Sequence, residues 1–217
     1  MTIKNNTVWV FDLDDTLYYE RDYQHSGFNA IAEYIQRCLN HDVSYVIEDA
    51  LKNKQDVLAQ VCEHLHTPTS VKESLLWIYR IHMPNIELTQ STKQTLNTIK
   101  QQAANVAILT DGRLITQRAK LTALGLSDWK AYVSEEWGET KPGRKRFEAV
   151  MQDNPSVTEF VYVGDNIKKD FITPNQLGWM TIGLKDTGRN IHPQRLEAVG
   201  EDFLPKKWIH SIADLLL

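Results

Sequence analysis

The stretch VWVFDLDDTLYYE, residues 8–20, passes from four apolar residues directly into a cluster of carboxylates. The run TVWVF at residues 7–11 is short, continuously apolar and β-rich, as in a parallel strand that is buried on both faces. Asp12, Asp14 and Asp15 follow it at once. Burying charge is costly unless the charge is paired, so the end of this strand must face a group that balances the acids.

Two further runs resemble this strand: NVAILT at residues 105–110 and FVYVG at residues 160–164. Each ends in a small or polar residue, and an acid, Asp111 or Asp165, comes next. MTIGL at residues 180–184 is a weaker fourth run. The repeated pattern predicts several parallel strands that end in polar residues.

Helical patterns lie between these runs. STKQTLNTIKQQA at residues 91–103 precedes the second run, with Ser91 as its expected N-cap. LITQRAKLTALG at residues 114–125 follows that run, and Gly125 is placed to end the helix. Because strands and helices alternate, the sequence predicts an α/β fold with a doubly wound parallel sheet, whose ligands bind beyond the carboxyl ends of its strands.

Residues 20–84 break this alternation. Their apolar residues follow helical spacing in three separate segments, Pro84 closes the last of them, and no run reads as a strand. We therefore predict a helical subdomain at residues 20–84, inserted into an α/β core that consists of residues 1–19 and 85–217.

The composition gives no reason to expect nucleic acid or a membrane as a partner. The 217 residues are 42% hydrophobic and 24% charged, with a net charge of −4, and no stretch approaches the ~18 apolar residues of a membrane helix. The basic run at residues 144–146 is interpreted as a solvated helix face, and Trp9 and Trp77 as core residues.

The sequence has two cysteines, Cys38 and Cys62, and both fall at apolar positions of helical patterns. Two cysteines do not make a disulfide framework, so we interpret them as buried thiols. The N-terminus has no apolar segment of the kind found in signal peptides. A cytoplasmic location is expected, and the oligomeric state is not determined by the sequence.

The predicted strands bring four acids and one hydroxyl to the same edge of the sheet: Asp12, Asp14, Thr110, Asp165 and Asp170. Four acids in one crevice repel each other, so some must be protonated or a cation must bind. All the charged ligands are oxygens, which favours a hard cation, and Mg²⁺ commonly binds through one or two carboxylates, waters and a substrate phosphate.

Lys141, in the segment ETKPG, is expected in a loop on the same side of the sheet. A lone lysine is usually a solvated charge, but this placement makes Lys141 a candidate anion ligand. Together with a metal ion, a threonine hydroxyl and backbone N–H groups, it would neutralise a phosphoryl group.

Four segments resemble the ordered motifs of the haloacid dehalogenase-like hydrolase superfamily: FDLDDTL (residues 11–17), ILTDG (108–112), KP (141–142) and VGDNIKKD (163–170). The helical insertion resembles the C1-type cap of that superfamily, which lies between the first and second motifs. The resemblance implies a Rossmann-like core and a Mg²⁺-dependent phosphatase that acts on a small phosphorylated metabolite.

The resemblance also implies roles for individual residues. Asp12 would be the nucleophile that becomes an aspartyl-phosphate, and Asp14 would first protonate the leaving oxygen and then activate water. The remaining roles are phosphate binding by Thr110, Asp111, Gly112 and Lys141, Mg²⁺ binding by Asp12, Asp165 and the backbone carbonyl of Asp14, and support of the site by Asp170 and Asn166.

Asp111 departs from the superfamily pattern, which often has Asn at this position. We interpret Asp111-Gly112 as a turn rather than as an additional acid at the phosphate. Asp15 is interpreted as structural, with its side chain bonding nearby backbone N–H groups. Asn166 is interpreted either as a residue that supports the metal ligands or as a turn residue.

Three other functions remain open at this stage. A phosphosugar mutase of the superfamily shares every catalytic residue. A 2-haloacid dehalogenase uses the first aspartate but lacks the acid two residues later and needs no metal, so Asp14 and Asp165 argue against it. A non-catalytic regulator on the same fold usually loses a motif, whereas all four are present in this sequence.

Overall fold

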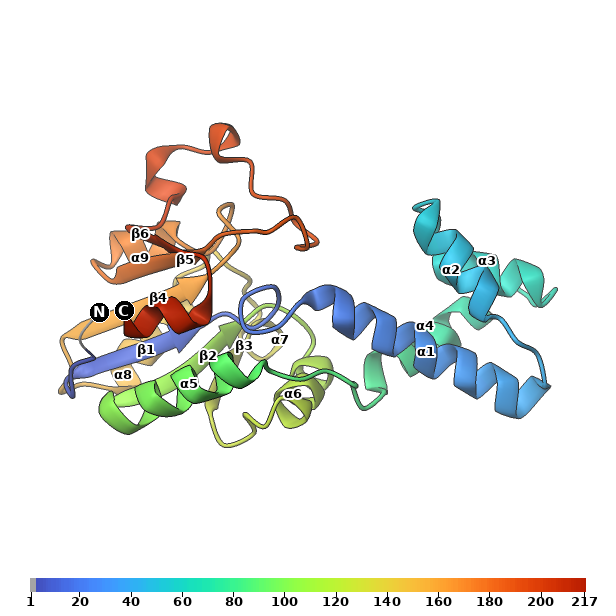
Figure 1. Cartoon of the computed structure of the whole chain (residues 1–217), viewed down its shortest axis with the longest axis horizontal. Helices are drawn as coiled ribbons and strands as arrows, with labels where there is room; N and C mark the ends of the chain where they lie inside the picture. Colours follow the sequence, from blue (N-terminus) through green and yellow to red (C-terminus); the bar gives the residue numbers. More distant parts are fainter. Residues whose placement is uncertain (1–2) are drawn as a thin grey trace. The chain divides into compact units, whose positions relative to one another are not determined.

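The computed structural model describes residues 3–217, which divide into two compact units. The first unit comprises the residues up to Arg21 and those from Glu87 onward, and the second comprises Asp22–Ile86. The predicted core and insertion have boundaries within two residues of these. Figure 1 labels the helices and strands of both units.

The first unit is built on a six-stranded sheet with the strand order β3-β2-β1-β4-β5-β6, and all its paired neighbours are parallel. This is the predicted doubly wound α/β fold. The strand order reverses between β1 and β4, which is where such sheets bind ligands. The strands are β1 (Thr7–Phe11), β2 (Asn105–Thr110), β3 (Lys130–Val133), β4 (Glu159–Gly164), β5 (Met180–Leu184) and β6 (Lys207–Ile209).

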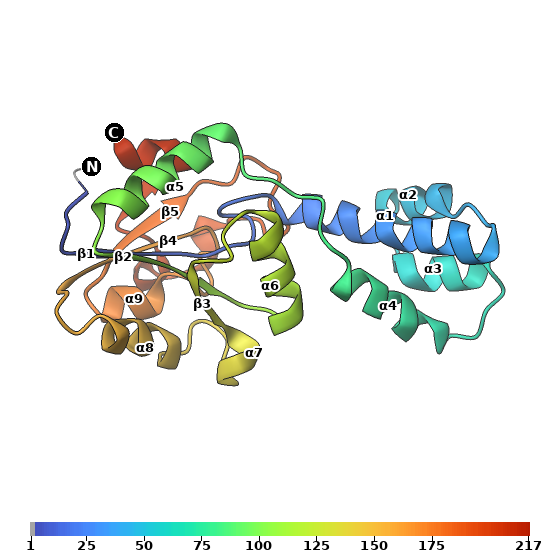
Figure 2. The same cartoon turned by 90° about the horizontal axis from the view of Figure 1, so that it is seen from below.

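Helices cover both faces of this sheet, as parallel connections require. Figure 2 shows α5 on one side of the sheet and α8 and α9 on the other. The helices of this unit are α5 (Gln90–Gln102), α6 (Leu114–Ala123), α7 (Ser134–Trp137), α8 (Lys145–Asp153) and α9 (Ile172–Gln176), with three 3₁₀ segments at Leu196–Ala198, Glu201–Phe203 and Ile212–Leu216.

The side chains of alternate residues of β1 lie on opposite faces of the sheet. Val8 and Val10 pack in a cluster with Phe147 of α8 and Tyr162 of β4, and all four are buried. On the other face, the Trp9 and Phe11 rings stack at a centroid distance of 6.2 Å. Because β1 is buried on both faces, the chain must leave it at Asp12 in a fixed position, and this is what makes the following acids a defined site.

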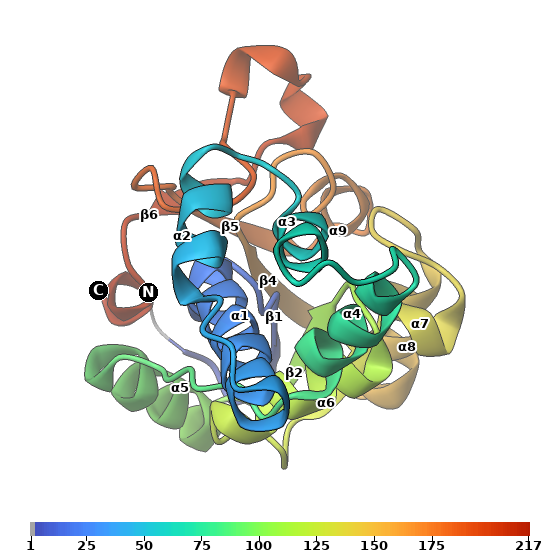
Figure 3. The same ribbon diagram turned by 90° about the vertical axis from the view of Figure 1, so that its right-hand side faces the viewer.

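The second unit is helical. It contains most of α1 (Glu20–Leu39) and all of α2 (Ser44–Lys52), α3 (Val57–His64) and α4 (Val71–Ile81). Figure 3 shows α2 and α3, which contact each other. Apolar residues from all four helices share one core of their own, including Ile31, Ile47, Val61 and Leu75.

The structure corrects several local predictions. The N-cap of α5 is Thr89, whose side chain accepts a hydrogen bond from the Thr92 N–H, and Ser91 lies inside the helix. Cys38 is exposed, although Cys62 is buried as predicted. The Trp77 side chain is 52% exposed and therefore is not a core residue, whereas Trp9 is buried. Gly125 ends α6 with a positive φ, as predicted.

Between residues 3 and 217, none of the helices combines the length and the apolar character that a membrane crossing requires.

Candidate active site

The carboxyl ends of β1, β2 and β4 lie side by side because β1 pairs with both β2 and β4. Asp12, Thr110 and Asp165 therefore lie at one edge of the sheet, and all three are buried. The Asp12 N–H continues the pairing beyond β1 by donating to the Val163 carbonyl, at 2.8 Å. The polypeptide backbone thus fixes the first acid at the edge.

Lys141 is the cation of this edge. Its ammonium Nζ lies 2.8 Å from Asp12 Oδ1 and 2.8 Å from Asp170 Oδ1, and the Lys141 side chain is 0% exposed. Burial alone would lower the pKa of Lys141, but the charges of Asp12 and Asp170 raise it well above its ordinary value. Lys141 is therefore a permanent positive charge in contact with the candidate nucleophile.

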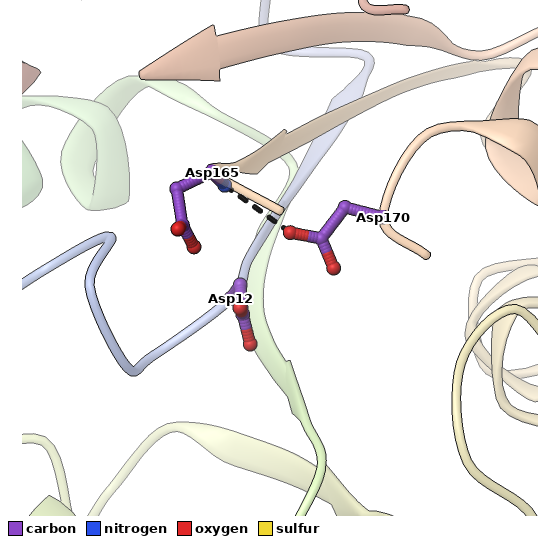
Figure 4. A group of neighbouring side chains, drawn as sticks. All are labelled: Asp12, Asp165 and Asp170. Carbon is purple, nitrogen blue, oxygen red and sulfur yellow. Dashed lines mark hydrogen bonds between the residues drawn. The ribbon is translucent and has the colours of Figure 1, made fainter. Parts of the chain in front are cut away.

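Asp12, Asp165 and Asp170 converge on one point, each offering an oxygen within 4.8 Å of the others (Figure 4). Burial, together with the charges of Asp170 and Asp12, raises the pKa of Asp165 well above its ordinary value. Burial also raises the pKa of Asp12 to about 6, although the Lys141 charge opposes it. Three buried carboxylates beside one lysine are electrostatically unfavourable, and a hard divalent cation with oxygen ligands fits this cluster.

Asp170 contacts both the turn after β4 and Lys141. Its Oδ2 accepts hydrogen bonds from the N–H groups of Asp165 and Asn166, at 3.1 and 2.8 Å, and its Oδ1 is paired with Lys141. These contacts engage both oxygens of Asp170 and hold the turn after β4 and the lysine at once. The supporting role of Asp170 stays a prediction.

The Asp14 carboxylate belongs to a hydrogen-bond network separate from that of Asp12, Lys141 and Asp170. It accepts hydrogen bonds from Lys120 Nζ at 2.6 Å, from Gln117 Nε2 at 2.9 Å and from the Tyr18 hydroxyl. Burial would raise the pKa of Asp14, but the Lys120 charge and these hydrogen bonds lower it. Asp14 is therefore ionised in this arrangement, which suits a group that accepts a proton.

Thr110 and Gly112 follow one another at the end of β2. The Thr110 hydroxyl accepts a hydrogen bond from Gln117 Nε2 at 2.7 Å. The Gly112 N–H donates to Ser134 Oγ at 2.9 Å, so phosphate binding by this N–H would require that bond to break. Gly112 has a φ of +148°, and an added Cβ would lie 3.0 Å from the Gln117 side chain.

A pocket of about 120 Å³ lies at the carboxyl edge of the sheet, and Asp12, Asp14, Thr110 and Asp165 are among the residues that line it. Pockets for whole small molecules are typically ~300–1,000 Å³, so this one has room only for a small group. The lining residues are Asp12, Asp14, Asp15, Glu20, Thr110, Asp111, Asp165, Asn166, Lys169 and His192.

A family model described as haloacid dehalogenase-like hydrolase matches residues 9–184, which include all four motifs. The chain belongs to the haloacid dehalogenase-like hydrolase family. The family resemblance of the four motifs is thereby confirmed.

Curated relatives of this hydrolase are phosphatases. A glyceraldehyde 3-phosphate phosphatase of Methanocaldococcus jannaschii is 27% identical over 187 residues, covering 80% of this chain and 82% of the relative. A ribulose-1,5-bisphosphate 5-phosphatase of Halopiger xanaduensis is 27% identical over 202 residues, covering 81% and 83%.

Solved structures share the fold of this hydrolase at lower identity. The magnesium-bound HAD hydrolase YfnB from Bacillus subtilis has a TM-score of 0.66 at 18% identity, covering 98% of this chain and 97% of that one. A 2-haloacid dehalogenase from Pseudomonas syringae has a TM-score of 0.63 at 19% identity, covering 99% and 97%. Hydrolases with different chemistry share this fold, so the function must be argued from the site.

Asp111, the departure from the superfamily pattern, is an ion-pair partner. Its Oδ1 lies 2.6 Å from Arg146 Nη2 and also accepts the Lys141 N–H, at 3.1 Å, and its Oδ2 lies 3.1 Å from Lys169 Nζ. Although burial opposes it, the charges of Lys141 and Lys169 hold the pKa of Asp111 below its ordinary value. The extra acid thus fixes the loop that carries Lys141.

The interpretation of residues 144–146 as a solvated face is wrong for Arg146, which is 0% exposed. Its Nη1 donates to the carbonyls of Thr110 and Tyr132, at 2.8 and 3.3 Å, and so joins the ends of β2 and β3. Tertiary contacts bury this guanidinium because Asp111 supplies its counter-charge.

We expect Asp111→Ala to destabilise the protein by about 3 kcal/mol, because it leaves the buried Arg146 guanidinium without its carboxylate. Urea unfolding measures this change. Asp128→Ala, which removes the partner of the exposed Lys100, is the matched control and should have a much smaller effect. Equal changes in the two variants would contradict a structural role for the Asp111–Arg146 pair.

Asp15 is structural, as predicted. Its Oδ1 accepts the Glu20 N–H at 2.9 Å, its Oδ2 accepts the Ile191 N–H at 2.8 Å, and its own φ is +56°. Asp15 thereby holds two segments of the pocket wall together. Asn166 lines the pocket, and its Oδ1 accepts the Lys168 N–H at 3.1 Å, as a turn residue does.

The Glu20 carboxyl makes the free energy of unfolding of the protein depend on pH. Burial, with the charges of Asp14 and Asp15, raises the pKa of Glu20 from 4.5 to about 7. The folded state therefore holds this proton more tightly than the unfolded chain. The resulting stabilisation is complete below about pH 4.5 and is lost as the pH rises through about 7.

We expect Glu20→Gln, which stays neutral, to raise the melting temperature of the metal-free protein at pH 8 and to change it much less at pH 5. Differential scanning calorimetry at the two pH values measures this difference. Glu33→Gln, at an exposed position of the same helix, is the control. The same shift at both pH values would show that Glu20 does not titrate in this range.

Several site residues lie outside the motifs and were not predicted. Gln117 and Lys120 are buried polar residues three positions apart on α6, a spacing that places them on one face of the helix. This was the one signal available in the sequence. The others carry no local signal, because distant segments bring them to the site: Arg146, Asn190, His192 and Gln194. Thr16 and Lys169 lie inside the first and fourth motifs, but no role was predicted for them.

Proposed function

We propose that this hydrolase is a Mg²⁺-dependent phosphatase that hydrolyses a small phosphomonoester through an aspartyl-phosphate on Asp12. One observation carries the proposal: Asp12 lies in a small pocket, in contact with the buried ammonium of Lys141 and beside Asp165. A nucleophile that is held next to a fixed cation and a metal-binding carboxylate is suited to attack an anionic phosphoryl group. The curated phosphatases at 27% identity support this assignment.

The proposed hydrolysis has two steps, phosphoryl transfer to Asp12 and hydrolysis of the resulting aspartyl-phosphate. In the first, an Asp12 oxygen forms a bond to phosphorus while the bond to the leaving oxygen breaks, and Asp14 gives that oxygen a proton, which Asp14 has taken up beforehand from solvent or from water in the preceding turnover. In the second, the Asp14 carboxylate takes a proton from water as the water oxygen attacks phosphorus, and inorganic phosphate leaves Asp12. Asp12 and Asp165, with the carbonyl of Asp14, would hold Mg²⁺, which when bound supplies positive charge beside the phosphoryl group.

Lys141 and Thr110 would hold the transferring phosphoryl oxygens. The Lys141 ammonium already touches Asp12, so it lies beside the bond that forms. Thr110 is 1% exposed and lines the same pocket, where its hydroxyl can donate to a phosphoryl oxygen while it accepts from Gln117. These positions support the phosphate-binding roles predicted for both residues.

Metal dependence is the direct test of this proposal. Chelator-treated protein should lose at least 90% of its activity toward an aryl phosphate, on the order of what removal of a main charge-stabilising group costs, and should recover it with Mg²⁺. Asp165→Asn should fail to recover at the same Mg²⁺ concentration. Full activity without metal, accompanied by halide release from a 2-haloacid, would instead support a dehalogenase.

The mutase alternative shares Asp12, Asp14 and Lys141 with the phosphatase, so only the product separates the two. A phosphatase releases inorganic phosphate, whereas a mutase returns a phosphosugar isomer. Phosphorus NMR of a reaction with a sugar phosphate distinguishes these outcomes. A regulator would give neither product, although the complete acidic cluster argues against it.

The substrate class is proposed from the relatives, whose names specify glyceraldehyde 3-phosphate and ribulose-1,5-bisphosphate. We infer a phosphorylated sugar or similarly small metabolite, and a panel of such compounds with Mg²⁺ identifies it. In this proposal residues 20–84 act as a C1-type cap that selects the substrate. Exchanging them for the insertion of a relative should change the preference within the panel while preserving Mg²⁺ dependence.

Both cysteines are free thiols, which is typical of a reducing compartment and supports the proposal of a cytoplasmic location.

A further inference from the structure

The segment that follows β5 reaches back to the metal-binding carboxylate. Asn190, which is 7% exposed, donates from Nδ2 to Asp165 Oδ2 at 2.8 Å. Gln194 Nε2 donates to the Asp165 carbonyl at 2.7 Å and also to the Leu184 carbonyl at 2.7 Å. Neither residue belongs to the four motifs, and both lie beyond residue 184, where the family match ends.

The turn that carries Asn190 is held by Asp186. One oxygen of this side chain, Oδ1, accepts the N–H groups of Gly188, Arg189 and Asn190, at 2.7, 3.1 and 3.1 Å. The Asp186 N–H in turn donates to Gln194 Oε1 at 2.9 Å. The segment therefore has its own hydrogen-bonded structure and does not depend on Asp165 for its shape.

Two contacts fix this turn against the first motif and the residues just after it. The Ile191 N–H donates to Asp15 Oδ2 at 2.8 Å, and the Arg189 guanidinium lies 3.7 Å from the centroid of the Tyr19 ring. The Asn190 amide is thus delivered from a segment anchored at both sides. An amide held in this way restricts the rotation of the carboxylate that it binds.

Asp165 is held on both of its oxygens. Asn190 donates to Oδ2, and the Thr16 hydroxyl donates to Oδ1 at 3.1 Å. A carboxylate offers about four lone pairs, so one lone pair on each oxygen stays available to a cation. The two hydrogen bonds orient the ligand without occupying its coordinating capacity.

We propose that Asn190 is a positioning residue that fixes the Asp165 carboxylate for Mg²⁺. The inference rests on the proposed function, because it takes Asp165 as the metal ligand. Groups that orient metal ligands typically change metal affinity 10–100-fold when they are removed. Asn190→Ala should therefore weaken Mg²⁺ binding by about 10–100-fold.

The test measures the melting temperature of the metal-free protein as a function of Mg²⁺ concentration, since a ligand that binds only the folded state raises it by mass action. Asn190→Ala should require about 10–100-fold more Mg²⁺ for the same rise. Asn97→Ala, at an exposed position on α5, is the matched control and should behave as the wild type. Asp186→Ala should shift the curve in the same direction by loosening the turn.

Activity provides a second readout. If Asn190 acts on metal binding, raising the Mg²⁺ concentration restores the turnover of Asn190→Ala toward the wild-type value, whereas loss of fold is not reversed in this way. Asp165→Asn distinguishes a failure of the proposed metal site from a failure of the proposed role of Asn190. If Asp165→Asn and the wild type respond to Mg²⁺ equally, the metal site itself is wrong. If only Asp165→Asn loses the response and Asn190→Ala keeps the wild-type curve, Asn190 has no positioning role and the proposed function stands.

Discussion

Asp12→Asn is expected to abolish turnover, lowering kcat by roughly 10⁴-fold or more, because losses of this size follow removal of a nucleophile. The amide is a poor nucleophile, and two other carboxylates of the pocket are held in ion pairs, Asp14 with Lys120 and Asp111 with Arg146. Steady-state hydrolysis of nitrophenyl phosphate with Mg²⁺ measures the loss.

The same variant should form no covalent phosphoenzyme, which acid quenching followed by intact-protein mass spectrometry detects in the wild type. Asp128→Asn, at an exposed site, is the control for a change from carboxylate to amide. A phosphorylated Asp12→Asn protein would place the nucleophile elsewhere and overturn the central assignment of this site.

Asp14→Asn is expected to have an effect that depends on the leaving group. General acid–base assistance contributes about 10²–10⁴-fold. An alkoxide that leaves from a sugar phosphate needs the proton, whereas nitrophenolate leaves well without it. Phosphoryl transfer from an alkyl phosphate should therefore fall far more than transfer from nitrophenyl phosphate.

With both substrates, Asp14→Asn should slow the second step, which is hydrolysis of the aspartyl-phosphate. The Lys120 charge, the Gln117 amide and the Tyr18 hydroxyl keep Asp14 ionised, which is the form that activates water. Without this base, Asp14→Asn should accumulate aspartyl-phosphate wherever the first step still proceeds. Pre-steady-state burst measurements on both variants with both substrates test this. Equal damage to phosphoryl transfer from the two substrates would leave Asp14 with only a metal-site or structural role.

The positions of Asp12, Thr110 and Asp165 were predictable because a short, continuous apolar run is a local property of the sequence. Once three apolar runs are assigned to parallel strands, their carboxyl ends must share an edge, and the polar residues that follow must meet there. The strand β6 was not predicted, because its three residues, Lys207–Ile209, are too few to form an apolar run.

The incorrect local predictions share one physical cause. Arg146 and Trp77 were judged by residue type, which gives only an average tendency to be buried. Arg146 is buried because Asp111, 35 positions earlier, supplies its counter-charge, and Trp77 is exposed because the helical unit fills its core with other side chains. Burial depends on what the fold places opposite a residue, and sequence spacing does not contain that information.

The sequence by itself determined the α/β fold, the acids at the strand ends and the order of the four motifs, since each depends on residues that are close together in the chain. Only the tertiary structure decided which partner each acid meets. Asp14 is paired with Lys120, Asp111 with Arg146, and Asp165 with Asn190. These partners lie 106, 35 and 25 positions away, and hydrogen bonds over a few ångströms form only after the chain has brought such segments together.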